Sequence, residues 1–113
     1  MKLITAIVRQ DRLEALADAL VAAGARGLTV TDVRGFGRQY GQLAAAHLAG
    51  VRKVEFLPKV RLELLIHDSG AAALVQEIAK QSETGDIGDG KIWVTPVEGA
   101  LRIRTGERDD DAL

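Results

Sequence analysis

The chain of 113 residues is 47% hydrophobic and 27% charged, a composition that predicts one folded domain, residues 1–113, of an ordinary soluble protein. Its formal net charge of -1 excludes a broadly basic surface for nucleic acid, and the absence of cysteine excludes disulfides, thiolate catalysis and cysteine metal sites. No apolar run approaches the roughly 18 residues of a membrane span, so we expect a cytoplasmic protein without direct membrane insertion.

The first unit of the chain is predicted to be strand, helix, strand. Residues 2–8 are apolar on both alternating faces except at Thr5, which predicts a central strand covered on both sides. Asp11 and Glu14 resemble a capping box, and apolar residues then recur at helical spacing, at Leu13, Leu16, Ala17, Leu20 and Val21. Gly24 is placed to end this helix, and residues 27–34 alternate as a second strand.

The unit repeats in the second half. One face of a third strand is formed by Val60, Leu62, Leu64 and Ile66. Asp68 or Ser69 can cap a helix whose apolar stripe is Ala71, Leu74, Val75 and Ile78, and residues 92–97 read as a fourth strand. This order predicts an α+β fold, a ferredoxin-like double βαβ sandwich with both helices on one face of an antiparallel sheet. Because strand 2–8 has no polar side, we expect the sheets of neighbouring subunits to pack together.

A long loop is predicted between the second and third strands, at about residues 37–57. The glycine-rich segment 35–57 shows no sustained alternation, and an insertion of this size is either functional or disordered. Its middle, residues 43–49, is compatible with a short exposed helix of alanines. We favour a mobile recognition loop, because its flanks hold polar groups that could bind a ligand and set the loop's shape; the flanks are Gly37, Arg38 and Gln39 on one side and Pro58 and Lys59 on the other.

Residues 84–106 contain the densest set of groups suited to a polyanion. A glycine turn (Gly85, Gly88, Gly90) leads to Lys91, and the match to GxxxxGK stops at Ile92, where a P-loop needs Ser or Thr. Because a strand follows instead of a helix, we reject a P-loop NTPase and keep a looser cradle of backbone N–H groups and Lys91.

Arg102 and Arg104 are predicted to extend this anion site. If residues 100–104 form a strand, both guanidinium groups leave the same face, roughly 6.5 Å apart, and suit phosphate oxygens. The alternative is a solvated strand face with two ordinary arginines. The remaining residues give no strong indication of a site. His47 and His67 lack the spacing of a metal site, and residues 107–111 are predicted to be a solvated acidic end. No catalytic residues are apparent.

The chain resembles a known family over nearly its whole length. It is similar to the PII nitrogen-regulatory signal-transduction proteins in four segments, in the family's order: TVTDVRGFGRQ, FLPKVRLEL, TGDIGDGKIWV and RIRTGERDDDAL. The resemblance implies a non-enzymatic homotrimer that binds ATP or ADP in clefts between subunits. It also implies sensing of 2-oxoglutarate, and regulation of a protein target, an enzyme or membrane transporter, through the loop.

The resemblance assigns roles residue by residue. The nucleotide phosphates would contact Gly37, Arg38, Gln39, Gly88, Gly90, Lys91, Arg102 and Arg104, and Asp89 would also belong to the nucleotide site. The nucleoside pocket would comprise Ile7, Thr29, Gly35 and Leu65. Gln39, Gly41 and Lys59 would bind 2-oxoglutarate, and Gln39 would contribute to a Mg²⁺ ion present only with ATP and the oxoacid.

Departures from the family's pattern lie mainly in the loop. The uridylylation motif Tyr-Arg-Gly-Ala-Glu-Tyr has no counterpart, and Arg9 and Gln10 stand where the family has Lys-Pro. The chain therefore resembles a divergent branch with an altered output surface. The target could lie in nitrogen metabolism, or be a metal or other transporter. A slow ATPase using the same cleft is the enzymatic alternative.

Overall fold

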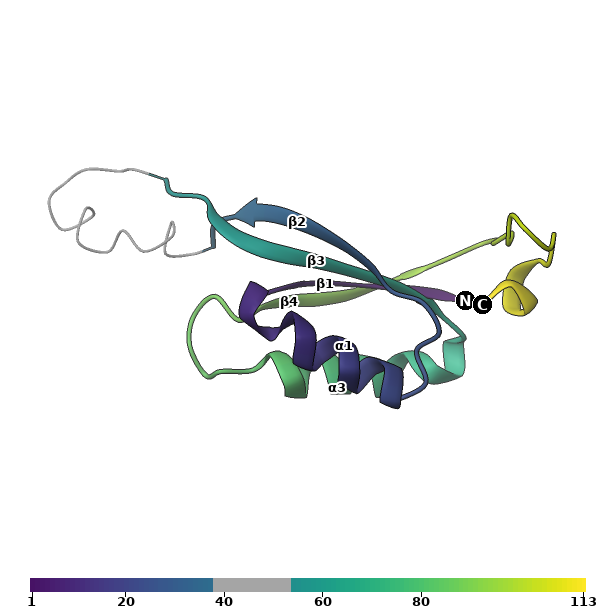
Figure 1. Cartoon of the computed structure of the whole chain (residues 1–113), viewed down its shortest axis with the longest axis horizontal. Coiled ribbons are helices and arrows are strands. Elements are labelled where there is room, and N and C mark those ends of the chain that lie inside the picture. The colour runs from purple at the N-terminus through teal and green to yellow at the C-terminus, as the bar shows by residue number, and fades with distance from the viewer. Residues whose placement is uncertain (38–53) are drawn as a thin grey trace, which may run out of the picture.

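The protein, described here from a computed structural model at residues 1–37 and 54–113, forms a four-stranded antiparallel sheet in the order β2-β3-β1-β4 (Figure 1). The strands are β1 (Lys2–Val8), β2 (Thr29–Gly35), β3 (Leu57–Ile66) and β4 (Gly90–Pro96). The helices α1 (Leu13–Ala22) and α3 (Asp68–Ser82) lie together on one face, and η1 (Gln10–Arg12) and η2 (Asp109–Ala112) are short 3-10 helices. This topology confirms the predicted ferredoxin-like double βαβ fold.

The core lies between the sheet and the two helices. Alternate residues of the inner strands β1 and β3 are buried there, namely Ile4, Ala6, Val8, Val60, Leu62 and Leu64. They pack against the predicted apolar stripes, of which Leu16, Leu20, Ala71, Leu74 and Ile78 are buried. The central position predicted for β1 is confirmed, because β1 pairs with both β3 and β4.

The other face of the sheet carries no helix in the described part of the chain (Figure 1). Thr5, opposite in direction to the core residues Ile4 and Ala6, is nevertheless 1% exposed. Beside it, Trp93 on β4 is paired with Thr5 and is 41% exposed. A large, half-exposed aromatic side chain on an uncovered sheet face is compatible with the subunit packing expected from the sequence, which stays a prediction.

The predicted helix starts are wrong in detail. The turn η1 precedes α1, so Asp11 lies within that turn and no side chain caps α1 at Arg12. Asp68 is the first residue of α3 and not its cap; its carboxylate pairs with the amino group of Met1 at 2.8 Å. A tertiary partner thus replaces the local cap. The predicted helix end is confirmed, because Gly24 follows α1 with φ 101°.

The predicted strand over residues 100–104 is also wrong. Leu101 forms only an isolated bridge to Arg108, and the chain turns at residues 103–105. Gly106, with φ 74°, allows this reversal, and its N–H donates to the carbonyl oxygen of Arg102 at 2.8 Å. Arg102 and Arg104 therefore do not share a strand face. The acidic residues 109–111 are exposed but belong to η2, so the end of the chain is folded.

Element boundaries near the predicted loop also shift. β3 begins at Leu57 and not Val60, β2 begins at Thr29 and not Gly27, and β4 spans Gly90–Pro96 where residues 92–97 were expected. Phe36 and Phe56 meet edge to face at the base of the loop, with ring centroids 5.4 Å apart. The choice between an alanine helix and a recognition loop falls on residues 38–53, outside the described residues.

Candidate functional site

The glycine turn between α3 and β4 is folded around the side chain of Asp89. The carboxylate accepts the N–H of Thr84 at 2.7 Å, the N–H of Gly85 at 3.0 Å and the hydroxyl of Thr84. These hydrogen bonds, with those from Thr84 foremost, hold the pKa of Asp89 well below its usual range. Of the three glycines expected to form a phosphate cradle, Gly85 thus donates its N–H to Asp89, and the cradle itself stays a prediction.

Two cationic side chains bind the same turn from the sheet. Arg9, just after β1, donates from Nε to Asp89 at 3.1 Å and from Nη2 to the carbonyl oxygen of Ile87 at 2.7 Å. Lys59, on β3, donates to the carbonyl oxygen of Gly88 at 2.6 Å. Burial, followed by the nearby charge of Arg9, lowers the pKa of Lys59. Arg9 was missed as a site residue, because its partners lie about 80 positions away in sequence.

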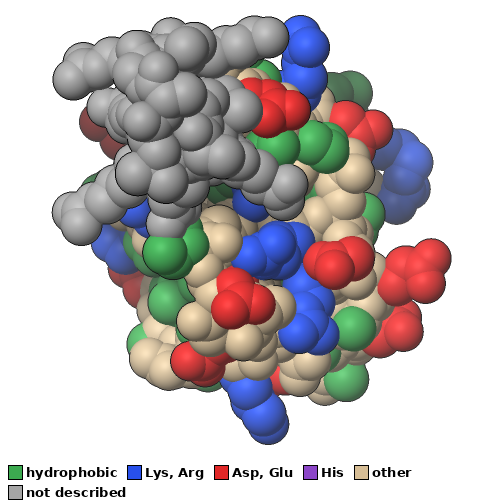
Figure 2. All heavy atoms as spheres, turned by 90° about the vertical axis from the view of Figure 1, so that its left-hand side faces the viewer, with side chains coloured by type: hydrophobic (Ala, Val, Ile, Leu, Met, Phe, Trp, Pro, Cys, Tyr) green, Lys and Arg blue, Asp and Glu red, His purple; other side chains and the backbone are tan. Residues whose placement is uncertain are grey.

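The register of the sheet brings several predicted residues to this end. Lys91 pairs with Ile7, Gly90 pairs with Val8, and Lys59 pairs with Val33. Gly35 ends β2 here and Gly37 follows it. Figure 2 looks at this end of the molecule and shows Lys and Arg side chains gathered in the middle of the face, among acidic ones. Arg38, Gln39 and Gly41 lie outside the described residues.

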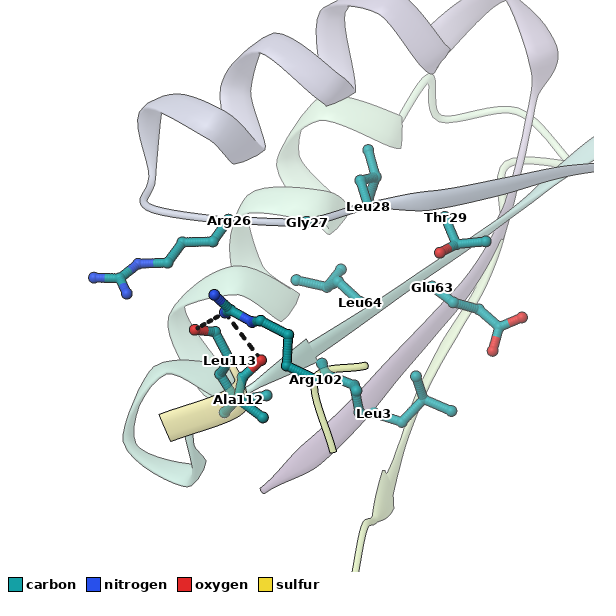
Figure 3. Close-up of a pocket in the computed structure, with 11 residues that line it drawn as sticks. Leu3, Arg26, Gly27, Leu28, Thr29, Glu63, Leu64, Arg102, Ala112 and Leu113 are labelled. Carbon is teal, nitrogen blue, oxygen red and sulfur yellow. Dashed lines mark hydrogen bonds between the residues drawn. The ribbon is translucent and has the colours of Figure 1, made fainter. Parts of the chain in front are cut away.

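A pocket of about 450 Å³ lies at the other end of the sheet, near both ends of the chain (Figures 1 and 3). It is lined by Leu3, Arg26, Gly27, Leu28, Thr29, Glu63, Leu64, Leu65, Arg102, Ala112 and Leu113. The pocket unites Thr29 and Leu65, expected at a nucleoside, with Arg102, expected at a phosphate. Arg104 is not among its lining residues.

The residues predicted for the nucleotide site therefore lie in separate groups along the sheet of one chain. Ile7, Gly35, Gly88, Asp89, Gly90 and Lys91 lie at the end with the glycine turn, whereas Leu65 and Arg102 lie at the pocket. Thr29 also lines the pocket, but the register places it level with Thr5, in the middle of β1. On β1 the two ends are marked by Ile7 and Leu3, four positions or about 13 Å apart. Within one chain, Leu65 and Arg102 are therefore separated along the sheet from Gly90 and Lys91.

The comparison with known proteins identifies the family. The chain matches the family described as "Nitrogen regulatory protein P-II" over residues 1–107. It belongs to this P-II family. Over 113 residues it is 47% identical to the Nitrogen regulatory protein P-II of Cereibacter sphaeroides and 44% identical to that of Azospirillum brasilense, with 100% of each chain covered. It is 43% identical to Nitrogen regulatory protein P-II 2 of Methanothermobacter thermautotrophicus, covering 100% of this chain and 97% of that one.

Membership of the P-II family confirms the functional class predicted from the sequence. P-II proteins are signal transducers of nitrogen regulation and not enzymes, so this chain is a regulatory protein. The enzymatic alternative, a slow ATPase, is therefore set aside. Separately, none of the helices within residues 1–37 and 54–113 has the length and apolar character needed to cross a membrane.

Proposed function

We propose that this P-II protein is a cytoplasmic homotrimer that binds ATP or ADP in clefts between its subunits. The division of the predicted contacts between two ends of the sheet carries the proposal. A ligand that contacts both Lys91 and Arg102 needs one residue from each of two subunits, because one chain holds them apart. The uncovered sheet face with Trp93 offers the surface on which subunits meet.

The chemistry of the two ends is complementary. The end with the glycine turn supplies Lys91, a compact charge that suits a phosphate group. The pocket supplies the guanidinium of Arg102, which binds phosphate oxygens as a fork, together with apolar walls for a base. Arg104, in the turn after Arg102, would reach the same ligand across the subunit boundary.

Mixed trimers test this arrangement. We expect Lys91→Ala and Arg102→Ala homotrimers to lose most ATP affinity, measured by calorimetry. When the two variants are refolded together, a cleft is intact wherever Lys91 comes from one variant and Arg102 from the other, in about a quarter of the clefts if subunits mix at random. Mixing Lys91→Ala with a Lys91→Ala, Arg102→Ala double variant should restore none. Equal binding in both mixtures would overturn a shared site.

We further propose that 2-oxoglutarate binds together with Mg²⁺ and ATP at the base of the 37–57 loop. Lys59 supplies a positive charge for a carboxylate, and its position beside Gly88 links that charge to the glycine turn. Gln39 and Gly41, the other expected contacts, lie outside the described residues. The loop would carry the signal to a protein target in nitrogen metabolism, an enzyme or a membrane transporter.

A further inference from the structure

The guanidinium of Arg102 is bound by the end of its own chain. Nη2 donates to the carbonyl oxygens of Ala112 and Leu113, at 3.1 Å each (Figure 3). Nη1 lies 3.8 Å from a carboxylate oxygen of Glu107. These partners all belong to the segment 107–113, and Ala112 and Leu113 also line the pocket. One of the two terminal nitrogens that would form a fork on phosphate is thus occupied.

The segment is held over the pocket by a small number of contacts. The N–H of Asp109 donates to the carbonyl oxygen of Ala100 at 2.8 Å, and the N–H of Ala100 donates to the Asp109 carboxylate at 3.2 Å. Farther along η2, Asp110 pairs with Nδ1 of His67 at 3.3 Å. The side chains of His67 and Asp110 are 51% and 66% exposed. A contact so exposed, and charged only when His67 is protonated, contributes little stability, so it adds little to the cost of detaching η2.

Asp109 marks the point about which η2 could turn. It has φ 52° and is the single non-glycine residue with positive φ within residues 1–37 and 54–113. This left-handed conformation is sparsely populated by side-chain-bearing residues, although Asp tolerates it better than most. If η2 leaves the pocket, Asp109 can therefore adopt a less strained backbone conformation.

We propose that η2 is a retractable cap that competes with nucleotide phosphate for Arg102. This inference rests on the proposed nucleotide site. In the capped state, main-chain oxygens of Ala112 and Leu113 accept hydrogen bonds from Arg102; in the bound state, phosphate oxygens replace them and η2 is released. The exchange is favourable because phosphate oxygens are charged and can accept from both terminal nitrogens of the guanidinium as a fork, whereas Ala112 and Leu113 accept from Nη2 alone. The apparent nucleotide affinity is lowered by the fraction of subunits in which the cap is closed.

A pair of neighbouring substitutions tests the cap. Asp110→Asn and Asp111→Asn remove the same negative charge from η2, but only Asp110 contacts another side chain among the described residues. We expect Asp110→Asn to bind ATP about twofold to fivefold more tightly than Asp111→Asn, because it weakens the closed state alone. Equal affinities of these two variants, each shown by circular dichroism to be folded, would overturn the cap.

Arg102→Ala distinguishes a failure of the cap from a failure of the proposed site. If Arg102→Ala binds ATP as the unchanged protein does, Arg102 is not a nucleotide contact and the proposed site itself is wrong there. If Arg102→Ala weakens binding but the Asp110 and Asp111 variants stay equal, the site stands and the cap is wrong. In the Arg102→Ala background, Asp110→Asn should confer no gain over Asp111→Asn.

Hydrogen exchange gives a second readout on the unchanged protein. The N–H of Asp111 donates to the carbonyl oxygen of Arg108 at 3.1 Å, and that of Leu113 donates to the carbonyl oxygen of Asp110 at 3.3 Å. Both hydrogen bonds lie within the segment that moves, and a helix of four residues is not stable without packing, so η2 should unwind on release. Exchange at both amides should therefore become faster when ATP is added, while amides in the middle of α3 are unchanged. Slower or unaltered exchange at residues 111 and 113 in the ATP complex would contradict release.

Discussion

Gly90 lies so close to β1 that a Cβ atom at residue 90 would be 1.7 Å from the carbonyl oxygen of Ile7. Gly90 also has φ 109°, a conformation that side-chain-bearing residues rarely adopt. The contact between Gly90 and Ile7 fixes where the glycine turn enters β4, and hence where Lys91, the second residue of β4, is placed. Any side chain at residue 90 must displace the backbone of β4 from β1.

Gly90→Ala should therefore be much more disruptive than Gly85→Ala. Gly85 also has positive φ, 82°, but a Cβ there would meet nothing within 4 Å. We expect Gly85→Ala to lower the free energy of unfolding by about 1 kcal/mol, and Gly90→Ala by about 2 to 4 kcal/mol, since overpacking adds to the backbone cost. Urea denaturation measures both. Equal losses would mean that contact with Ile7 does not constrain residue 90.

Asp89→Asn should change the acid stability of the fold. The folded-state pKa of Asp89 lies below its ordinary value of 3.8, chiefly because Thr84 donates hydrogen bonds to the carboxylate. The ionised form thus stabilises the folded state above pH 3.8, and this contribution is lost as pH falls through the folded-state pKa. Asp89→Asn should lower the free energy of unfolding at pH 7. The free energy of unfolding of this variant should also fall less on acidification than that of the unchanged protein.

Asp86→Asn is the matched control for Asp89. Asp86 lies in the same turn, but its carboxylate makes no hydrogen bond or ion pair with another described residue. Unfolding midpoints in urea between pH 3 and pH 7 should follow the unchanged protein for Asp86→Asn. If both variants respond to acid alike, the hydrogen bonds from Thr84 are not what couples the turn to pH.

Lys59→Ala should separate the two sensing functions proposed for the site. Removing the ammonium deletes the expected partner of the oxoacid carboxylate, whereas ADP would keep Lys91, Arg102 and Arg104. Calorimetry should show no effect of 2-oxoglutarate on ATP binding and nearly unchanged ADP affinity. Lys80→Ala, in the last turn of α3, should alter neither. Loss of ADP binding along with the oxoglutarate effect would identify Lys59 as a phosphate contact.

Trp93→Glu should dissociate the proposed trimer without unfolding the subunit. Trp93 is 41% exposed in the single subunit, so a carboxylate there can remain hydrated, but in a subunit interface it would be buried without a partner. Val21→Glu places the same charge on α1 at a residue that is 66% exposed. Light scattering should give a mass near 12.1 kDa only for Trp93→Glu. An unchanged mass for that variant would exclude this face as the interface.

Tyr40 should not be uridylylated. It is the only tyrosine in the chain and follows Gln39 directly in sequence, at the start of the loop expected to carry the signal. From the sequence we expect the residues around Tyr40 to lack the modification motif of the family's uridylylated branch. Intact mass spectrometry of protein from nitrogen-starved and nitrogen-replete cells should therefore give one mass. A nucleotide-monophosphate adduct at Tyr40 in either sample would refute this.

The sequence alone determined the layers of the fold. In β1 the buried residues Ile4, Ala6 and Val8 are two positions apart, which is the spacing of a strand. In α1 Leu16 and Leu20 are four positions apart, which is the spacing of a helix. The sequence of each segment therefore predicts both its secondary structure and its buried face. Because connections between strands and helices follow strict rules, the repeated strand-helix-strand order is compatible with only a few sheet topologies. The four segments that resemble the P-II family are also short and continuous in the sequence, so the sequence alone was enough to indicate the family.

Only the tertiary structure decided how the candidate site is divided and supported. Arg9 and Asp89 meet across 80 positions of sequence, and no local pattern encodes that contact. The pairing of Arg102 with Ala112 and Leu113 depends on a chain reversal at Gly106. The sequence did not predict this reversal, because apolar and basic residues alternate over residues 100–104 as they would in a strand. Lys91 and Arg102 are near in sequence but lie at opposite ends of the sheet, because β4 and the segment after it carry the chain along the whole length of β1. The sequence separation of two residues does not give their distance in space, which depends on the register in which the strands pair.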